Sequence, residues 1–115
     1  MAFRGRSLAI MRSNTEKNMN TYKELKELSK TRKRKLANNT YLVVRDDGGF
    51  GVRLHNTEVV IHYKDKIVLN TDGWFTNTTK SRINEFSPFN IYQRNYQWFI
   101  NDGIPFEDNI VLKVA

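Results

Sequence analysis

The chain of 115 residues is long enough for one small domain with a modest hydrophobic core. It contains no Cys, which excludes a disulfide framework, a thiolate nucleophile and a thiolate metal site. Hydrophobic residues make up 39% of the chain, too many for a wholly disordered protein, and no apolar run is long enough for a membrane span.

The formal net charge of +7 is concentrated near the N-terminus. Residues 1–40 hold eleven Lys or Arg and three Glu, a net charge of +8, whereas residues 41–115 hold eight basic and nine acidic residues, a net charge of −1. We therefore divide the chain into a basic N-terminal arm and helix (residues 1–39) and an antiparallel β-rich domain (residues 40–115). Residues 1–12 are Arg-rich and free of acids, which favours a flexible basic arm.

The spacing of apolar residues predicts a helix from about Thr21 to Ala37. Thr21 is followed three residues later by Glu24, a pair that can cap a helix N-terminus. The apolar stripe of this helix consists of Tyr22, Leu25, Leu28 and Leu36. Its last turns would carry the basic run, which we define as Lys30, Arg32, Lys33, Arg34 and Lys35.

From Thr40 onward the apolar residues alternate, as is typical of strands. We expect strands over residues 41–45, 50–55, 59–63, 67–69, 89–94, 96–101 and 110–114. A short helix, from Thr78 or Thr79 to Phe86 (about residues 79–86), should follow the fourth strand and end before Pro88. The predicted fold is α+β: a small bent antiparallel sheet or partial barrel with a basic N-terminal helix and one short helix after the fourth strand.

Burial suggests a register for the strands. A turn at residues 56–57 would give three apolar cross-strand pairs: Leu54–Val59, Val52–Ile61 and Phe50–Tyr63. A three-residue loop at residues 64–66 would then keep the same face apolar in the next strand. Among the aromatic residues we assign Trp74 and Trp98 to the core. Phe75, Tyr92 and Phe99 are candidates for exposed platforms on which unpaired bases stack.

The basic run is the sharpest functional signal in the sequence. Several of its side chains could reach phosphates, which gives salt-dependent affinity with little sequence preference. A second candidate phosphate site lies at the start of the short helix. There Lys80 and Arg82 stand where the helix dipole disfavours cations unless an anion is bound. The second site comprises Thr76, Thr78, Thr79, Lys80 and Arg82.

Catalytic and metal chemistry find little support in the sequence. The two histidines, His55 and His62, should lie on the order of 13 Å apart along the strands and cannot easily share a metal ion. No carboxylate stands at a spacing that indicates hydrolysis with either histidine. We therefore predict no enzyme activity, no metal site and no cofactor.

The leading hypothesis is a non-enzymatic nucleic-acid-binding protein, located in the cytoplasm and without a membrane partner. The alternative is a protein-interaction module that inhibits a host protein or toxin, or a minor virion component. The sequence does not distinguish DNA from RNA or single from double strands, and it leaves the oligomeric state open.

The stretch from Val52 to Phe86 resembles a pattern of small bacteriophage proteins. In that group a strand ending in Leu-His leads to Leu-Asn, Gly-Trp or Gly-Tyr, Thr-Thr-Lys and Arg-Ile-Asn. The corresponding residues here are Leu54-His55, Leu69-Asn70, Gly73-Trp74, Thr78-Thr79-Lys80 and Arg82-Ile83-Asn84. The resemblance implies a phage or mobile-element origin, and a cytoplasmic location would then mean the host cell. It implies no activity and carries over no catalytic residue.

Overall fold

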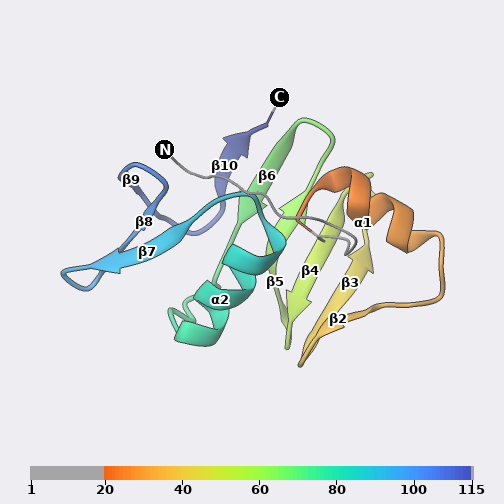
Figure 1. The fold of residues 1–115 in the computed structure, drawn as a ribbon, viewed down its shortest axis with the longest axis horizontal. Coiled ribbons are helices and arrows are strands. Elements are labelled where there is room, and N and C mark those ends of the chain that lie inside the picture. The colour runs from red at the N-terminus through yellow and green to blue at the C-terminus, as the bar shows by residue number, and fades with distance from the viewer. Residues whose placement is uncertain (1–19, 115) are drawn as a thin grey trace, which may run out of the picture.

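The computed structural model describes residues 20–114, so the predicted basic arm over residues 1–12 lies outside the described residues. Within residues 20–114 the chain forms two helices and nine strands, arranged in two antiparallel sheets (Figure 1). The helices are α1 (Tyr22–Ser29) and α2 (Asn77–Phe86). The larger sheet has the order β10-β6-β5-β4-β3-β2, with bounds β2 Lys35–Ala37, β3 Thr40–Val44, β4 Phe50–Leu54, β5 Thr57–His62, β6 Lys66–Leu69 and β10 Ile110–Lys113. The smaller sheet has the order β7-β8-β9, with bounds β7 Ile91–Arg94, β8 Gln97–Ile100 and β9 Ile104–Pro105.

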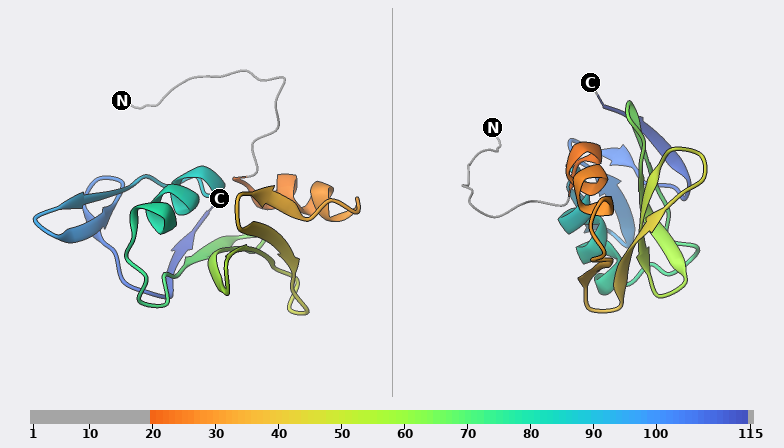
Figure 2. Two further views of the ribbon diagram at one scale, coloured as in Figure 1. Left: turned by 90° about the horizontal axis from the view of Figure 1, so that it is seen from below. Right: turned by 90° about the vertical axis from the view of Figure 1, so that its right-hand side faces the viewer.

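Both helices cover the same face of the six-stranded sheet, and its other face is open (Figure 2). The sheet bends around the helices without closing, which confirms the predicted α+β fold with a bent antiparallel sheet. Leu25 of α1 and Ile83 of α2 are fully buried against Val52, Val60 and other inward residues of the sheet. The last strand, β10, returns to pair with β6, so the small β7-β8-β9 sheet is an excursion between α2 and β10.

The N-terminal helix is shorter than the spacing predicted. Thr21 does cap α1, because its side chain accepts the N–H of Glu24. The helix ends at Ser29 and not at Ala37, and the hydroxyl of Thr31 bonds to the Leu28 carbonyl just beyond its end. No apolar residue stands between Leu28 and Leu36, so nothing in that interval could hold further helical turns on the sheet. The end of the predicted helix is strand β2 instead, and α2 therefore follows the fifth strand.

The register predicted between β4 and β5 is wrong, by two residues at Leu54 and by one residue at Val52 and Phe50. The turn between β4 and β5 lies at His55–Asn56, and the observed pairs include Leu54 with Thr57 and Val52 with Val60. A β-bulge at Val59 places Val59 and Val60 together opposite Val52, and both are buried. The alternation of apolar and polar residues in the sequence could not reveal that Val59 is an extra residue in β5.

The bulge changes which residues face the core after Val60. His62 is buried and pairs with Phe50 and Ile67, whereas the prediction placed Ile61 and Tyr63 inside. Ile61 and Tyr63 instead lie on the open face. The loop between β5 and β6 accordingly needs only Lys64 and Asp65, closed by the bond from the Tyr63 N–H to the Lys66 carbonyl.

The aromatic residues divide differently from the prediction. Trp98 is in the core, as predicted, in edge-to-face contact with Phe75 and Phe106. The assignment of Trp74 to the core is wrong: 63% of its surface is exposed, because Phe75 and Phe106 already cover Trp98. Phe75 is exposed, as predicted, whereas Tyr92 and Phe99 are half-buried and stack on each other.

His62 joins the sheet to the end of α2 and makes stability depend on pH. Its Nε2 lies 2.7 Å from the Phe86 carbonyl oxygen, so the neutral ring donates Nε2–H and Nδ1 carries no proton. Nδ1 has no hydrogen-bond partner among the described residues. Burial lowers the pKa of His62 below its ordinary value of 6.5. Below pH 6.5 the unfolded chain therefore takes up a proton that the folded protein excludes.

We expect the free energy of unfolding to fall as pH drops below 6.5, with a slope of up to about 1.4 kcal/mol per pH unit until the folded pKa is reached. Urea unfolding between pH 7.5 and 5 measures this slope. His62→Gln should remove it, whereas His55→Gln, at an exposed turn position, should leave it. Asp47, with a pKa of about 2, affects stability only at lower pH. An unchanged slope in His62→Gln would contradict the assignment.

Candidate nucleic-acid interface

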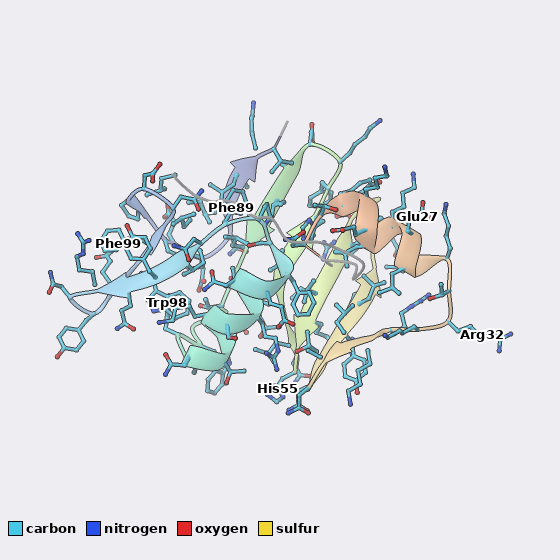
Figure 3. The ribbon with its side chains drawn as sticks, viewed as in Figure 1. Glu27, Arg32, His55, Phe89, Trp98 and Phe99 are labelled. Atoms are coloured by element: carbon cyan, nitrogen blue, oxygen red, sulfur yellow. The ribbon has the colours of Figure 1, made fainter. Side chains whose placement is uncertain are left out.

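The basic run lies in the connection from α1 to β2 and not on a helix. Lys30 caps the C-terminus of α1, and Lys35 begins β2. Helix α1 itself carries two Lys and two Glu, so the positive charge of this region belongs to the connection. Figure 3 shows Arg32 extending away from the fold at the turn between the two elements. A connection of this kind exposes its cations in several directions.

The five cations of the basic run differ in their partners. Lys30 pairs with Glu27 at 3.1 Å on the protein surface. The Arg34 guanidinium donates to the carbonyl oxygens of Thr31 and Lys33 and so closes the connection on itself. Arg32, Lys33 and Lys35 are exposed, and their side chains have no hydrogen bond or ion pair within residues 20–114. These three cations are therefore available to an external anion.

The start of α2 differs from the predicted phosphate site. Thr76 is the N-cap, since its hydroxyl oxygen accepts the Thr79 N–H at 3.1 Å; the expected caps, Thr78 and Thr79, lie inside the helix. Thr79 is 2% exposed, and its hydroxyl bonds to that of Thr76 at 3.0 Å. Thr78 is exposed. The Thr76 hydroxyl thus satisfies one of the free N–H donors at the helix start.

The two cations of α2 are directed toward the protein. The Lys80 ammonium lies 5.8 Å from the centroid of the Trp98 ring, a cation–π contact. Arg82 donates Nε–H to the Thr40 hydroxyl at 2.8 Å and Nη2–H to the Asn38 carbonyl at 3.3 Å, and it pairs loosely with Glu85. Both cations near the start of α2 therefore have partners within the protein.

The two predicted sites do not form one surface. Helix α2 covers the inner face of the sheet, whereas Lys35 pairs in register with Tyr41 on the open face. Arg82 reaches from α2 to Asn38 in the β2–β3 turn and to Thr40 at the start of β3, and Lys80 points to the smaller sheet.

A pocket of about 620 Å³ lies between the β4–β5 turn and the segment that leads into α2. Its lining residues are Leu54, His55, Asn56, Thr57, Val59, Thr71, Asp72, Trp74, Thr76, Thr78 and Thr79. Figure 3 places His55 at this end of the sheet. No Lys or Arg lines the pocket and Asp72 does, so the charge balance does not suit a phosphate group.

A group of hydrogen-bonded charges lies on the open face. Arg45 pairs with Asp47 at 3.2 Å and with Glu58 at 2.7 Å, and the Tyr63 hydroxyl donates to Asp47 at 2.7 Å. The bonds from Arg45 and Tyr63 lower the pKa of Asp47 to about 2. The same bond to Asp47 raises the pKa of Tyr63. The Asp47 carboxylate is thus ionised at neutral pH, and it shares the Arg45 guanidinium with Glu58.

Sequence reasoning missed several residues of the open face. Tyr41 and Arg53 are cross-strand partners in β3 and β4, and Lys66 and Lys113 are partners in β6 and β10. The predicted register concealed Tyr63, because it placed this residue inside. The outward positions of the strands would have identified this set once the bulge at Val59 was known.

The described residues contain no cluster of three or more His, Cys, Asp or Glu that could hold a metal ion. No helix within residues 20–114 is long and apolar enough to cross a membrane.

Comparison with protein-family models gives a match for this chain. No curated protein and no solved structure matches the chain. The family model of the Kyanoviridae Gp96 protein matches residues 11–113, which is nearly the whole chain. Kyanoviridae are phages, so a phage origin, which the sequence pattern had implied, is supported. The chain belongs to the Kyanoviridae Gp96 protein family.

Proposed function

We propose that this phage protein is a non-enzymatic nucleic-acid-binding protein whose basic run contacts the phosphate backbone. The supporting observation is the exposure of Arg32, Lys33 and Lys35, which have no ion pair within residues 20–114. Three cations so close in the chain attract a polyanion in preference to single anions. Lys30 and Arg34 support the site less directly, since each already has a protein partner.

Replacing Arg32, Lys33 and Lys35 with Gln should weaken binding by on the order of tenfold at low salt, because up to three phosphate contacts disappear. The dependence of log K on log salt should become shallower by about 2 for single strands or about 3 for duplex DNA. Fluorescence anisotropy with labelled DNA and RNA, at several salt concentrations, measures both quantities.

A matched control replaces Lys23, Lys26 and Arg94, which are exposed elsewhere, with Gln. It removes the same formal charge and should change affinity less than the variant of the basic run. The proposal fails if the unmodified protein binds neither DNA nor RNA at low salt, or if the two triple variants bind equally.

The alternative function is a protein-interaction module that inhibits a host protein or toxin, or a minor virion component. Two adjacent aromatic residues, Trp74 and Phe75, are 63% and 54% exposed and favour a protein contact. A stoichiometric protein partner that survives nuclease and moderate salt, and that is lost in Trp74→Ala, would favour this function.

A further inference from the structure

The open face of the six-stranded sheet carries cations next to aromatic rings. The Arg53 guanidinium lies 5.7 Å from the centroid of the Tyr41 ring, and the Lys66 ammonium lies 5.1 Å from the centroid of the Tyr63 ring. Neither helix covers these side chains, because α1 and α2 both lie on the other face (Figure 2). The open face therefore presents two cation–aromatic pairs.

The two pairs stand near opposite ends of the sheet. The Tyr63 ring lies beside Gly49, and the Gly49 carbonyl accepts the Arg45 N–H, so Tyr63 is level with Arg45. Tyr41 lies four residues before Arg45 in the chain. The rings are thus separated by about 13 Å along the strands, at about 3.3 Å per residue. Half-buried Val43 and Ile61 lie between them in one cross-strand row. A chain of a few nucleotides could span this distance.

The charge of this face is unbalanced. Asp47 and Glu58 share a single cation, Arg45, so this group has a net charge of −1. The face also carries four other cations: Lys35, Arg53, Lys66 and Lys113. Lys66 and Lys113 are direct cross-strand partners, an arrangement that is destabilising for like charges. Neither lysine has an ion pair within residues 20–114. A bound anion would relieve the repulsion between them.

The open face is continuous with the basic run. Lys35 of β2 pairs with Tyr41 of β3, and Tyr41 pairs with Arg53 of β4. These three residues form a row of two cations and one aromatic ring across the strands. A polyanion on the basic run can therefore extend over Tyr41 to Arg53. The next residue in this row, Glu58, is already paired with Arg45.

We propose that the open face binds a single-stranded nucleic acid, with bases stacked on Tyr41 and Tyr63. Each base takes the ring face that the cation now covers, and Arg53 and Lys66 turn to the neighbouring phosphates. A duplex cannot bind in this way, because its bases are already stacked and paired. The inference rests on the proposed function and adds to it the type of strand and a second part of the binding surface.

The test compares a labelled 12-nucleotide single strand with a duplex of the same sequence, using the full chain. OB-fold domains, which bind single strands on a sheet face, cover about 4 to 16 nucleotides, so we choose a probe within this range. The single strand should bind more tightly. Tyr41→Ala with Tyr63→Ala should weaken its binding by about 10- to 100-fold, the range typical of lost base stacking. Tyr41→Phe with Tyr63→Phe keeps both rings and should retain most of the affinity.

Tyr96→Ala is the matched control, since Tyr96 is 96% exposed at the tip of the smaller sheet. Tyr41→Ala alone gives a second test, because the Tyr41 side chain makes no hydrogen bond within residues 20–114 and its removal should leave the fold intact. Equal binding of single strand and duplex, with both Tyr→Ala variants unchanged, would overturn the inference but not the proposed function. Absence of binding to either probe would overturn both.

Discussion

Replacing Asp108 with alanine is expected to lower the free energy of unfolding by about 3 kcal/mol or more. The Asp108 carboxylate accepts the N–H of Thr71 at 2.7 Å, the hydroxyl of Thr71 at 2.8 Å and the N–H of Gly73 at 3.2 Å. Thr71 is fully buried, so its donors cannot turn to water once the carboxylate is gone. A buried donor left without an acceptor costs about 1–3 kcal/mol. Urea unfolding followed by tryptophan fluorescence measures the loss.

Two further variants test whether the loss of stability comes from the hydrogen bonds of the Asp108 carboxylate. Asp108→Asn retains one carbonyl oxygen and should lose less stability than Asp108→Ala. Asp102→Ala removes an exposed carboxylate without a hydrogen bond within residues 20–114 and should be nearly neutral. A loss of less than about 1 kcal/mol in the free energy of unfolding of Asp108→Ala would contradict this prediction. The segment between β6 and α2 would then not depend on the Asp108 carboxylate.

Leu25→Ala should lower the free energy of unfolding by about 2–5 kcal/mol, because it leaves a cavity under α1. Leu25 is the one residue of α1 that is buried in the core, and only Tyr22 and Leu28 of the same helix pack beside it, each partly buried. A helix of eight residues has little stability of its own, so its place depends on this contact. Calorimetry or urea unfolding gives the value.

Lys26→Ala provides the control for this experiment, since Lys26 is exposed on the same helix. It should change stability by less than about 0.5 kcal/mol. Equal effects of the two variants would mean that α1 is not anchored through Leu25. Because α1 leads directly into the basic run, Leu25→Ala should also loosen the connection that carries those cations.

Many helices and strands of the fold were predictable because they follow from patterns between residues that are close in the sequence. The alternation from Phe50 to Leu54 gave a strand with its correct inner face, and Thr21 with Glu24 located the start of α1. The predicted α1 was too long because Leu36 completed a helical spacing by chance. Its partial burial comes from strand β2, which pairs with β3 as a hairpin and places Leu36 against the core. Helical spacing alone does not distinguish this arrangement from a further helical turn.

The candidate interface was only partly predictable. The basic run is visible in the sequence because its cations are consecutive or nearly so. The open-face residues are scattered over five strands and meet only through pairing, and one bulge was enough to misplace Tyr63. For Arg82 the sequence showed the charge but not its partners. Arg82 bonds to Thr40 and Asn38, which are about forty residues away in the sequence, so this contact could not be predicted from neighbouring residues.

The bulge at Val59 also determines what a one-residue deletion in β5 would do to the sheet. In most strands, deleting one residue reverses the direction of every side chain beyond it. Here Val59 and Val60 share the position opposite Val52, so loss of either valine would leave the other there and make the ladder continuous. Glu58 and Ile61 would keep their present faces. We therefore expect that deleting Val59 from this chain would preserve the sheet.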